Sequence, residues 1–385
     1  MSDATKRLFN VDDARRLARR RMPRMMYDFV TGAAGSERAA VRNCDAFGDV
    51  QLQPRVLVNI EDSALATTIL GQEMGLPFGF APMGMCALSW PGADRFLGAE
   101  AVSRNIPHCV STASSTALEE MQRLAPGRVW FQLYTGTSAA ATDELIDRAE
   151  AARYEVLILT VDTPKLSRRI RDQRNGFQVP FRFGPKQVLD FALHPRWSLT
   201  TLAQGIPKPM NFETSKVGKE FKRGDSRGAT DWDFLDRLRA RWTGKLVVKG
   251  IMSTPDAVRI RDAGADAVYV SNHGGRQLDS APPALAALPS IRAAVGPDYP
   301  IIFDSGVRGG EDIVKALALG ADFVMLGRPL LYALGADGGR GLGDLLDGIA
   351  EDLSVTMAQL GCTRISDINE MVLAEHWERE RHERD

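Results

Sequence analysis

Eight short apolar runs, separated by stretches with helical periodicity, organise most of the chain. Several of the runs are almost continuously apolar, which is typical of strands that are covered on both faces. Strands that alternate with helices in this way favour an α/β fold of the (β/α)8 TIM barrel type over a doubly wound sheet. The runs are 78–81, 108–111, 129–132, 156–160, 246–249, 267–271, 301–304 and 323–326.

Most of these runs end in a polar or small residue. In a (β/α)8 barrel the carboxyl ends of the strands meet at one face, and that face carries the active site. A barrel with only a structural role has no reason to place a lysine and an aspartate there. We therefore expect a functional site at the strand ends, formed by Ser111, Gln132, Thr160, Lys249, Ser271 and Asp304.

The rest of the chain predicts additions to a single barrel. Residues 1–77 look helical and are expected to form an N-terminal helical cap, followed by the barrel over 78–372 and a charged tail over 373–385. An insertion at about 178–230 separates the fourth and fifth strands and mixes basic with aromatic residues. Such a segment fits either a lid over the site or a patch that binds a membrane surface, and both interpretations stay open.

Composition narrows the class of protein. The chain has 385 residues, of which 44% are hydrophobic and 25% charged, as in ordinary globular proteins. A net charge of −1 argues against a general nucleic-acid binder. The four cysteines have no CxxC spacing, which argues against a zinc ribbon or a disulfide framework, and no metal site is expected. No secretory signal and no bilayer-spanning run is visible, so we expect a cytoplasmic protein, either soluble or peripheral on the inner face of the membrane.

The segment 271–277, Ser-Asn-His-Gly-Gly-Arg-Gln, carries the densest chemical signal. It places His273 and Arg276 in one glycine-rich loop at the end of the sixth strand. A histidine accepts a proton near neutral pH, and an arginine binds a carboxylate with two parallel hydrogen bonds. A lone histidine is more often structural, but this one stands at a strand end beside an arginine.

Two further loops predict a phosphate site. Asp304-Ser-Gly-Val-Arg-Gly-Gly follows the seventh strand, and Gly327-Arg-Pro follows the eighth. Barrel enzymes commonly bind phosphate at these two positions through backbone N–H groups and a helix N-terminus. The motifs GxGxxG, GxxxxGK[ST], GxSxG and HExxH are absent from the sequence, so a Rossmann site, a P-loop, a serine hydrolase and a zincin have no support.

These motifs together resemble those of the FMN-dependent α-hydroxy-acid dehydrogenase/oxidase family, which includes L-lactate dehydrogenase, mandelate dehydrogenase and glycolate oxidase. The resemblance runs from about residue 8 to 370 and is weakest between about 180 and 228. Besides 271–277, it rests on Phe-Gln-Leu-Tyr at 131–134, Leu-Thr-Val-Asp-Thr-Pro at 159–164, Val-Lys-Gly at 248–250 and Asp-Ser-Gly-Val-Arg at 304–308.

The resemblance implies FMN as cofactor and an L-2-hydroxy acid, lactate-like or mandelate-like, as substrate. It makes His273 the base, paired with Asp162, while Tyr134 binds the substrate oxygen. The substrate carboxylate is expected to be bound by Arg169, Arg276 and Tyr27. The residues implied for FMN binding are Ala81, Pro82, Met83, Ser111, Gln132, Thr160, Lys249, Ser271, Asp304, Gly306, Arg308, Gly327 and Arg328.

Three positions depart from the pattern of the oxidases. Gly84 resembles the dehydrogenase members and favours transfer of electrons to a quinone or another acceptor rather than to oxygen. Met83 is bulkier than the usual residue. Ala113 stands where glycolate oxidase has a tryptophan, so we expect room for a larger substrate side chain, unless another residue, for example from 178–230, fills that space.

Several alternatives remain open at this stage. One is an oxidase that uses oxygen and makes hydrogen peroxide. Another is an FMN-barrel isomerase without net redox chemistry, and a third is a flavin-binding scaffold without catalysis. The side chain of the hydroxy acid, the electron acceptor and the choice between hydride and carbanion routes are not fixed by the sequence. The resemblance further suggests a homo-oligomer, a tetramer.

Overall fold

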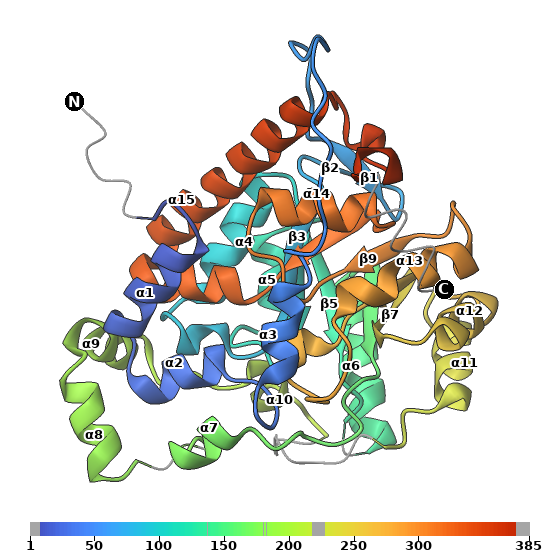
Figure 1. The fold of residues 1–385 in the computed structure, drawn as a ribbon. Helices are drawn as coiled ribbons and strands as arrows, with labels where there is room; N and C mark the ends of the chain where they lie inside the picture. The colour runs from blue at the N-terminus through green and yellow to red at the C-terminus, as the bar shows by residue number, and fades with distance from the viewer. Residues whose placement is uncertain (1–7, 137, 180, 182, 218–227, 375–385) are drawn as a thin grey trace.

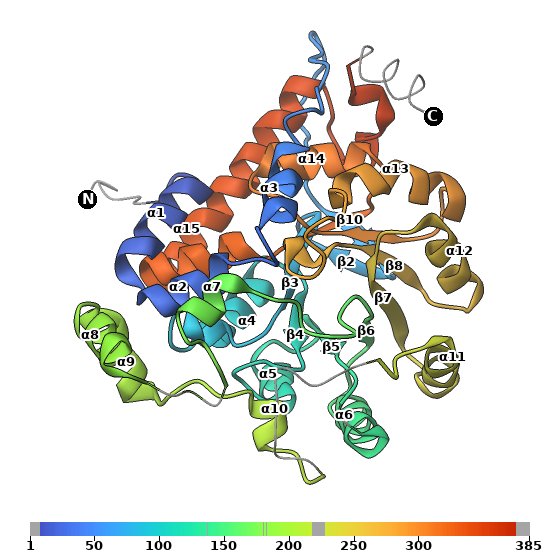
Figure 2. The same cartoon turned by 60° about the horizontal axis from the view of Figure 1, so that its bottom comes forward.

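The computed structural model describes residues 8–136, 138–179, 181, 183–217 and 228–374. Its centre is a closed barrel of parallel strands in the order β10-β3-β4-β5-β6-β7-β8-β9 (Figures 1 and 2). All eight apolar runs in the sequence are strands of this barrel, so the predicted TIM barrel is confirmed. The strands are β3 Phe78–Met83, β4 His108–Ser111, β5 Val129–Leu133, β6 Val156–Thr160, β7 Lys245–Ile251, β8 Ala267–Val270, β9 Ile301–Phe303 and β10 Phe323–Leu326.

The strands are apolar on both faces because each face meets a different core. Side chains that point into the barrel form an inner cluster with large rings from Trp130, Tyr269 and Phe323. Their neighbours along the strands, such as Phe80 and Phe131, belong to an outer cluster beneath the helices. This double burial explains why the runs are continuously apolar rather than alternating.

Helices cover the barrel between successive strands, as the alternation predicts. Ser253, for example, caps α12 by accepting a hydrogen bond from the backbone N–H of Asp256, and Pro255 lies in its first turn. The helices of this layer are α4 Ala93–Ser103, α5 Leu118–Leu124, α6 Ala139–Ala151, α11 Trp232–Arg241, α12 Thr254–Asp262, α13 Ala284–Val295, α14 Gly310–Ala318 and α15 Arg328–Leu360.

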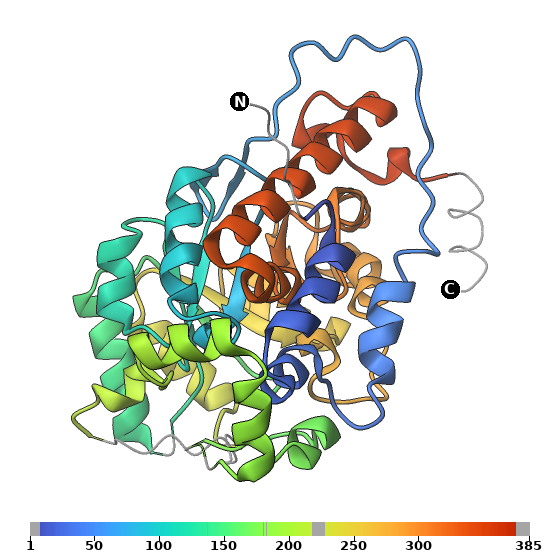
Figure 3. The same ribbon diagram turned by 90° about the vertical axis from the view of Figure 1, so that its left-hand side faces the viewer.

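The N-terminal segment is helical only in its first part. Helices α1 Val11–Arg21, α2 Arg24–Thr31 and α3 Arg38–Asp45 are followed by an arm that arches away from the body (Figure 3) and by a hairpin, β1 Thr67–Ile69 with β2 Gln72–Met74. The hairpin packs against the barrel interior, where the indole N–H of Trp130 donates to the Gln72 side chain. The expectation that this segment is helical therefore holds for α1 to α3 and is wrong for the arm and the hairpin that follow.

Helix α1 lies along α15 (Figures 1 and 2) and joins the cap to the end of the barrel. Alanines 14 and 18 and Met22 bury the contact face of this segment. Met22 comes so close to Gly335 of α15 that a β-carbon there would lie 2.3 Å from its sulfur. Helix α15 is kinked at Asp337 and Gly338. Close packing against α15 therefore fixes the cap on the barrel.

The insertion between β6 and β7 carries short helices at the periphery of the molecule (Figure 2). After α7 Ile170–Arg174 come α8 Pro185–Ala192, α9 Pro195–Gln204 and α10 Met210–Glu213. Residues 218–227, and most of the predicted charged tail, lie outside the described residues. Within the described residues, every helix is too short or too polar to cross a membrane.

Candidate active site

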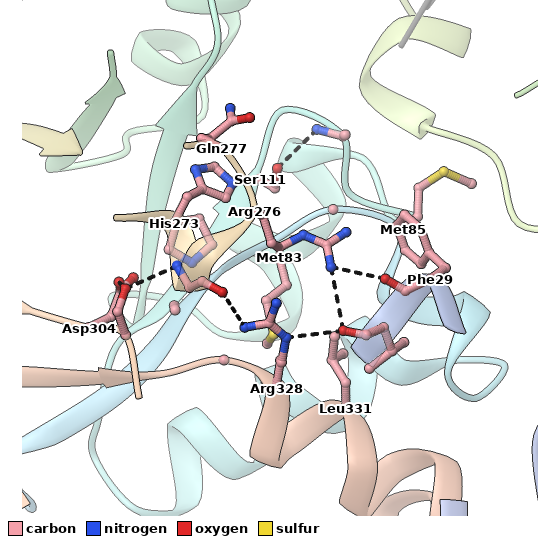
Figure 4. Close-up of a pocket in the computed structure, with 18 of the residues that line it drawn as sticks. Phe29, Met83, Met85, Ser111, His273, Arg276, Gln277, Asp304, Arg328 and Leu331 are labelled. Carbon is pink, nitrogen blue, oxygen red and sulfur yellow. Dashed lines mark hydrogen bonds between the residues drawn. The ribbon is translucent and has the colours of Figure 1, made fainter. Parts of the chain in front are cut away.

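A pocket opens at the carboxyl ends of the strands, where the polar strand ends predicted a site (Figure 4). Most of the residues singled out in the sequence line it. They are Ala81, Pro82, Met83, Ser111, Tyr134, Arg169, Lys249, His273, Arg276, Asp304, Gly306, Arg308, Gly327 and Arg328. Asp162, Gln132, Thr160 and Ser271 are hydrogen-bonded to these residues or to one another just beneath the surface of the pocket.

His273 is oriented by Asp162 on one side and faces Tyr134 on the other. Its Nδ1 lies 3.0 and 3.2 Å from the two carboxylate oxygens of Asp162, and its Nε2 lies 3.4 Å from the Tyr134 hydroxyl. A carboxylate only accepts hydrogen bonds, so Nδ1 carries the hydrogen and the lone pair of the neutral ring is on Nε2. Nε2 is therefore the atom that can take a proton.

The protonation of His273 follows from its surroundings. Burial lowers its pKa below the ordinary value of 6.5, and this effect outweighs the Asp162 carboxylate, which raises the pKa. The positive charges of Lys249 and Arg169 lower the pKa further. The imidazole is consequently neutral at pH 7, as a proton acceptor must be.

The loop that presents His273 needs left-handed backbone. His273, Gly274 and Gly275 have φ values of 58°, 62° and 75°, a region that side chains other than glycine seldom adopt. A β-carbon on Gly275 would lie 2.4 Å from the backbone nitrogen of Ala40 in α3. The glycine pair of the motif therefore lets the loop turn and lets the cap approach it.

Lys249 and Asp304 form a buried pair that Ser271 completes. The Lys249 Nζ lies 2.9 Å from Asp304 and donates to the Ser271 hydroxyl at 2.6 Å, which in turn donates to Asp304 at 2.5 Å. Burial alone would raise the pKa of Asp304, but Lys249 and the hydroxyls of Ser271 and Ser305 lower it. The carboxylate stays ionised, and a fixed positive charge lies at the base of the pocket.

A second row of polar side chains crosses the ends of β4, β5 and β6. The Ser111 hydroxyl donates to the Gln132 amide oxygen at 2.9 Å, and the Gln132 amide donates to the Thr160 hydroxyl at 3.0 Å. Each of these side chains is buried. Their mutual bonds fix the orientation of the amide, so the row is rigid before any ligand arrives.

The far end of the pocket suits a phosphate. Arg308 and Arg328 both line it, and the main-chain amides of Gly327 and Arg328 open helix α15 there without a side-chain cap among the described residues. Burial, together with the like charge of Arg308, lowers the pKa of Arg328. Two repelling guanidinium groups beside a helix N-terminus are stabilised by an anion, and this arrangement fits the phosphate of FMN.

Arg276 and Arg328 share an acceptor on the N-terminal cap. One guanidinium nitrogen of Arg276 donates to the carbonyl oxygens of Phe29 at 3.0 Å and Gly32 at 2.7 Å. Arg328 also donates to the Gly32 oxygen, at 3.0 Å, so the two side chains converge on that carbonyl. Both also donate to the Val30 oxygen, Arg276 at 3.5 Å and Arg328 at 3.3 Å (Figure 4). The carbonyls at the end of α2 thus hold cations from two different loops.

Tyr27, expected at the substrate carboxylate, is absent from the lining of this pocket. It is buried in the core of the cap, and its side chain is hydrogen-bonded to Arg15. Phe29, two positions later on the same helix, lines the pocket instead. Two residues correspond to about 200° around a helix, so the two rings point to nearly opposite sides.

The structure adds apolar lining residues that the motifs did not reveal. Phe177 and Val179, which follow α7, line the pocket together with Leu166 and Leu331. Val179 belongs to the predicted insertion, which therefore contributes directly to the wall. Gly84 and Ala113 are neighbours, because a β-carbon on Gly84 would lie 3.1 Å from that of Ala113. Both small residues belong to the lining of the pocket.

Comparison with known proteins agrees with this geometry. The family model for FMN-dependent dehydrogenase matches residues 18–375. The chain is 38% identical to the (S)-mandelate dehydrogenase of Pseudomonas putida over 94% of its length and 93% of the relative's. It is 36% identical to an L-lactate dehydrogenase of Caulobacter vibrioides over 94% and 97%.

Solved structures give the same result. A (S)-mandelate dehydrogenase described as a monotopic membrane protein superposes with a TM-score of 0.91 at 38% identity, covering 96% of this chain and 100% of the other. A mandelate oxidase superposes with a TM-score of 0.80 at 33% identity, over 94% and 97%. The chain belongs to the FMN-dependent dehydrogenase family and is an FMN-dependent oxidoreductase.

Proposed function

We propose that the protein oxidises an L-2-hydroxy acid to the 2-oxo acid. The observation that carries this proposal is the neutral His273, whose Nε2 is 3.4 Å from the Tyr134 hydroxyl in a pocket also lined by Arg169 and Arg276. A base beside two carboxylate-binding cations suits a molecule that carries a hydroxyl next to a carboxylate. The names of the mandelate and lactate relatives support the same class.

In this proposal each side chain has one task. His273 takes the hydroxyl proton at Nε2, and Asp162 stabilises the imidazolium that forms. Arg276 and Arg169 bind the carboxylate and fix the acid in one orientation, while the Tyr134 hydroxyl donates to the substrate oxygen. FMN would supply the oxidant, which takes up the α-hydrogen of the substrate together with two electrons. Lys249 contributes a fixed positive charge near the base of the pocket.

The residues proposed to hold FMN surround the same pocket. Arg308, Arg328, Gly306 and Gly327 would form the anion site for its phosphate, and Asp304, 2.9 Å from Lys249, lines the same pocket. The remaining proposed contacts are the backbone of Ala81, Pro82 and Met83 with the side chains of Ser111, Gln132, Thr160 and Ser271.

The residues that line the pocket suggest the size of the substrate and the kind of electron acceptor. Gly84 and Ala113 are small residues in the lining, and Phe177 and Phe29 offer aromatic contacts, so we expect a mandelate-like acid to be preferred over lactate. Gly84 also supports a dehydrogenase that passes electrons to a quinone, although relatives that act on mandelate include an oxidase.

An anaerobic titration tests the proposal. L-lactate, L-mandelate and their D-enantiomers are added to the FMN-loaded protein, and the flavin absorbance is followed. L-acids should bleach the flavin, and a quinone analogue should restore the colour faster than oxygen does. His273→Ala should slow bleaching by at least about a hundredfold while FMN content is unchanged.

His194→Ala is the matched control, because this histidine lies in the insertion, next to α8 and α9, and away from the pocket. Its bleaching rate should equal that of the wild type. The proposal fails if no L-2-hydroxy acid bleaches the wild-type flavin, or if His273→Ala is reduced at the normal rate.

We further propose that the protein binds a membrane surface through α8 and α9. Helix α8 has no buried residue, and the pair of helices exposes Leu189, Leu193, Leu199 and Leu202, each more than 60% accessible. Lys186 and Arg196 lie on the same two helices. Exposed leucines beside basic residues are typical of a segment that lies at the lipid interface. The monotopic relative supports this placement.

A homo-oligomer is proposed from the arm between α3 and β1. Backbone bonds from Gln53, Arg55 and Ala64 to the C-terminal segment hold its two ends. Between them, Val56 is 81% exposed and Leu57 fully exposed, with Leu57 in the left-handed region at φ 62°. An ordered apolar tip held out in solvent fits a contact with a second copy of the chain.

A further inference from the structure

Arg276, which the proposed function assigns to the substrate carboxylate, is held by an aromatic ring of the cap. Its guanidinium carbon lies 5.3 Å from the centre of the Phe29 ring. The same guanidinium donates to the backbone oxygens of Phe29 and Gly32. Phe29 therefore contacts Arg276 twice, through the face of its ring and through its carbonyl group.

Phe29 is itself held by a ring from the segment after α7. The rings of Phe29 and Phe177 stack with centres 4.4 Å apart and planes 11° apart. Phe181 then meets the edge of Phe177 at 5.7 Å. Phe177 is only 7% exposed, and both Phe29 and Phe177 line the pocket. The ring beneath Arg276 is thus fixed from two elements far apart in sequence.

We propose that Phe29 is a positioning residue for Arg276, and that the Phe29–Phe177 stack sets the direction in which this guanidinium meets the substrate carboxylate. The inference rests on the proposed function and extends it to the cap and to the segment after α7. Arg276 acts on the substrate, while Phe29 acts through Arg276.

The physical reason lies in the shape of the guanidinium. Arginine has many rotamers, and bidentate binding of a carboxylate needs one orientation of its plane. The negative face of an aromatic ring attracts the cation and favours a defined placement over it. An aliphatic side chain of similar volume fills the same space without this attraction. Replacement of the ring should therefore weaken carboxylate binding more than it slows the chemistry.

The test uses Phe29→Leu in the FMN-loaded, full-length protein. We expect KM for the L-2-hydroxy acid to rise about tenfold, the change that corresponds to loss of a desolvated cation–π contact, with a much smaller effect on kcat. Phe29→Tyr keeps the ring and should restore a KM close to that of the wild type. FMN content, measured from absorbance after denaturation, should be equal in all variants.

Phe234→Leu is the matched control. It removes a ring from a second arginine contact, Arg237 over Phe234 at 6.0 Å on α11, which lies outside the pocket. This variant should leave KM unchanged. A general loss of stability on removing a phenylalanine would instead affect both variants alike.

A binding measurement separates this inference from the proposed function. The dissociation constant of a 2-oxo acid, read from the shift in flavin absorbance, should rise in Phe29→Leu by the same factor as KM. If the wild type binds 2-oxo acids but no hydroxy acid reduces it, the proposed function fails and the binding test of Phe29 still stands. Equal dissociation constants for Phe29→Leu and wild type overturn the inference.

Phe177→Leu is a second test of the proposal, which can be used if Phe29→Leu does not fold. It leaves the Arg276–Phe29 contact in place and removes only the ring that stacks on Phe29. We expect an increase in KM and in the dissociation constant of about threefold, smaller than for Phe29→Leu. Wild-type values for a folded, FMN-loaded Phe177→Leu overturn the role of the stack.

Discussion

At the scale of single residues, the chemistry depends on how His273 is kept neutral. The ring is buried, and burial disfavours the charged form, while Asp162 at 3.0 Å favours it. Burial is the larger effect, so the pKa lies below 6.5. Because the proton acceptor is the neutral form, the rate of substrate oxidation should fall only as the pH falls through this lowered pKa.

Replacement of Asp162 tests how this carboxylate changes the pKa of His273. Asp162→Asn removes the charge that raises the pKa of His273, so the acid limb of the kcat/KM profile should move to lower pH. The rate at its plateau should also fall, by about a hundredfold or more, because the imidazolium loses its counter-charge. The measurement is the pH dependence of anaerobic flavin reduction in both proteins. An acid limb that moves to higher pH would contradict the assignment of Asp162 as the charge that raises the pKa of His273.

Most of the candidate site was predictable because its residues stand at strand ends or in short motifs. Sequence order alone brings Lys249, His273 and Asp304 to one face of a barrel. Tyr27 and Phe29 show the limit of this reasoning. Both are aromatic and lie on one helix, and which of them faces the pocket depends on the rotation of α2 against α1 and α15. Packing between distant segments fixes that rotation, and no local pattern records it.

At the scale of elements, the strands were predictable, whereas the helices inside the insertion were not. Continuous apolar runs identify strands that are buried on both faces, whatever the loops do. Helices α8 and α9 instead leave most of their leucines in solvent, so hydrophobic periodicity there does not identify a partner within the chain. The hairpin β1–β2 was not predictable either, because its three-residue strands are too short to give a periodic signal.

The proposed membrane contact belongs to this scale. Replacement of Leu189, Leu193, Leu199 and Leu202 with glutamine should reduce co-sedimentation with anionic liposomes by at least about tenfold, since burial of each leucine stabilises by roughly 1.5–3 kcal/mol. Flavin reduction by the hydroxy acid should remain normal. Substitution of two exposed apolar residues outside the insertion, Val355 on α15 and Met371, is the control. Equal liposome binding by all three proteins would exclude α8 and α9 as the contact.

At the scale of the whole molecule, the exposed arm predicts self-association. Leu57→Asp places a charge at the tip, and burying an unpaired charge in an interface costs several kcal/mol, so the mass measured by light scattering should fall towards that of the monomer. Leu124→Asp, at the end of α5, is the control and should leave the mass unchanged. A wild-type protein that is monomeric at micromolar concentration would show that the arm has another role.

The carbonyl of Gly32 joins the cap to the barrel, because it accepts hydrogen bonds from two arginines of the barrel. A boundary between residues 77 and 78 separates cap from barrel along the chain, yet the oxygen that orients Arg276 and Arg328 lies on the cap side. A barrel expressed alone would keep both arginines and lose their common anchor. A cap taken from a relative would therefore have to place a carbonyl oxygen at the same point. Without it, Arg276 and Arg328 would lose the orientation that we propose they need to bind their anions.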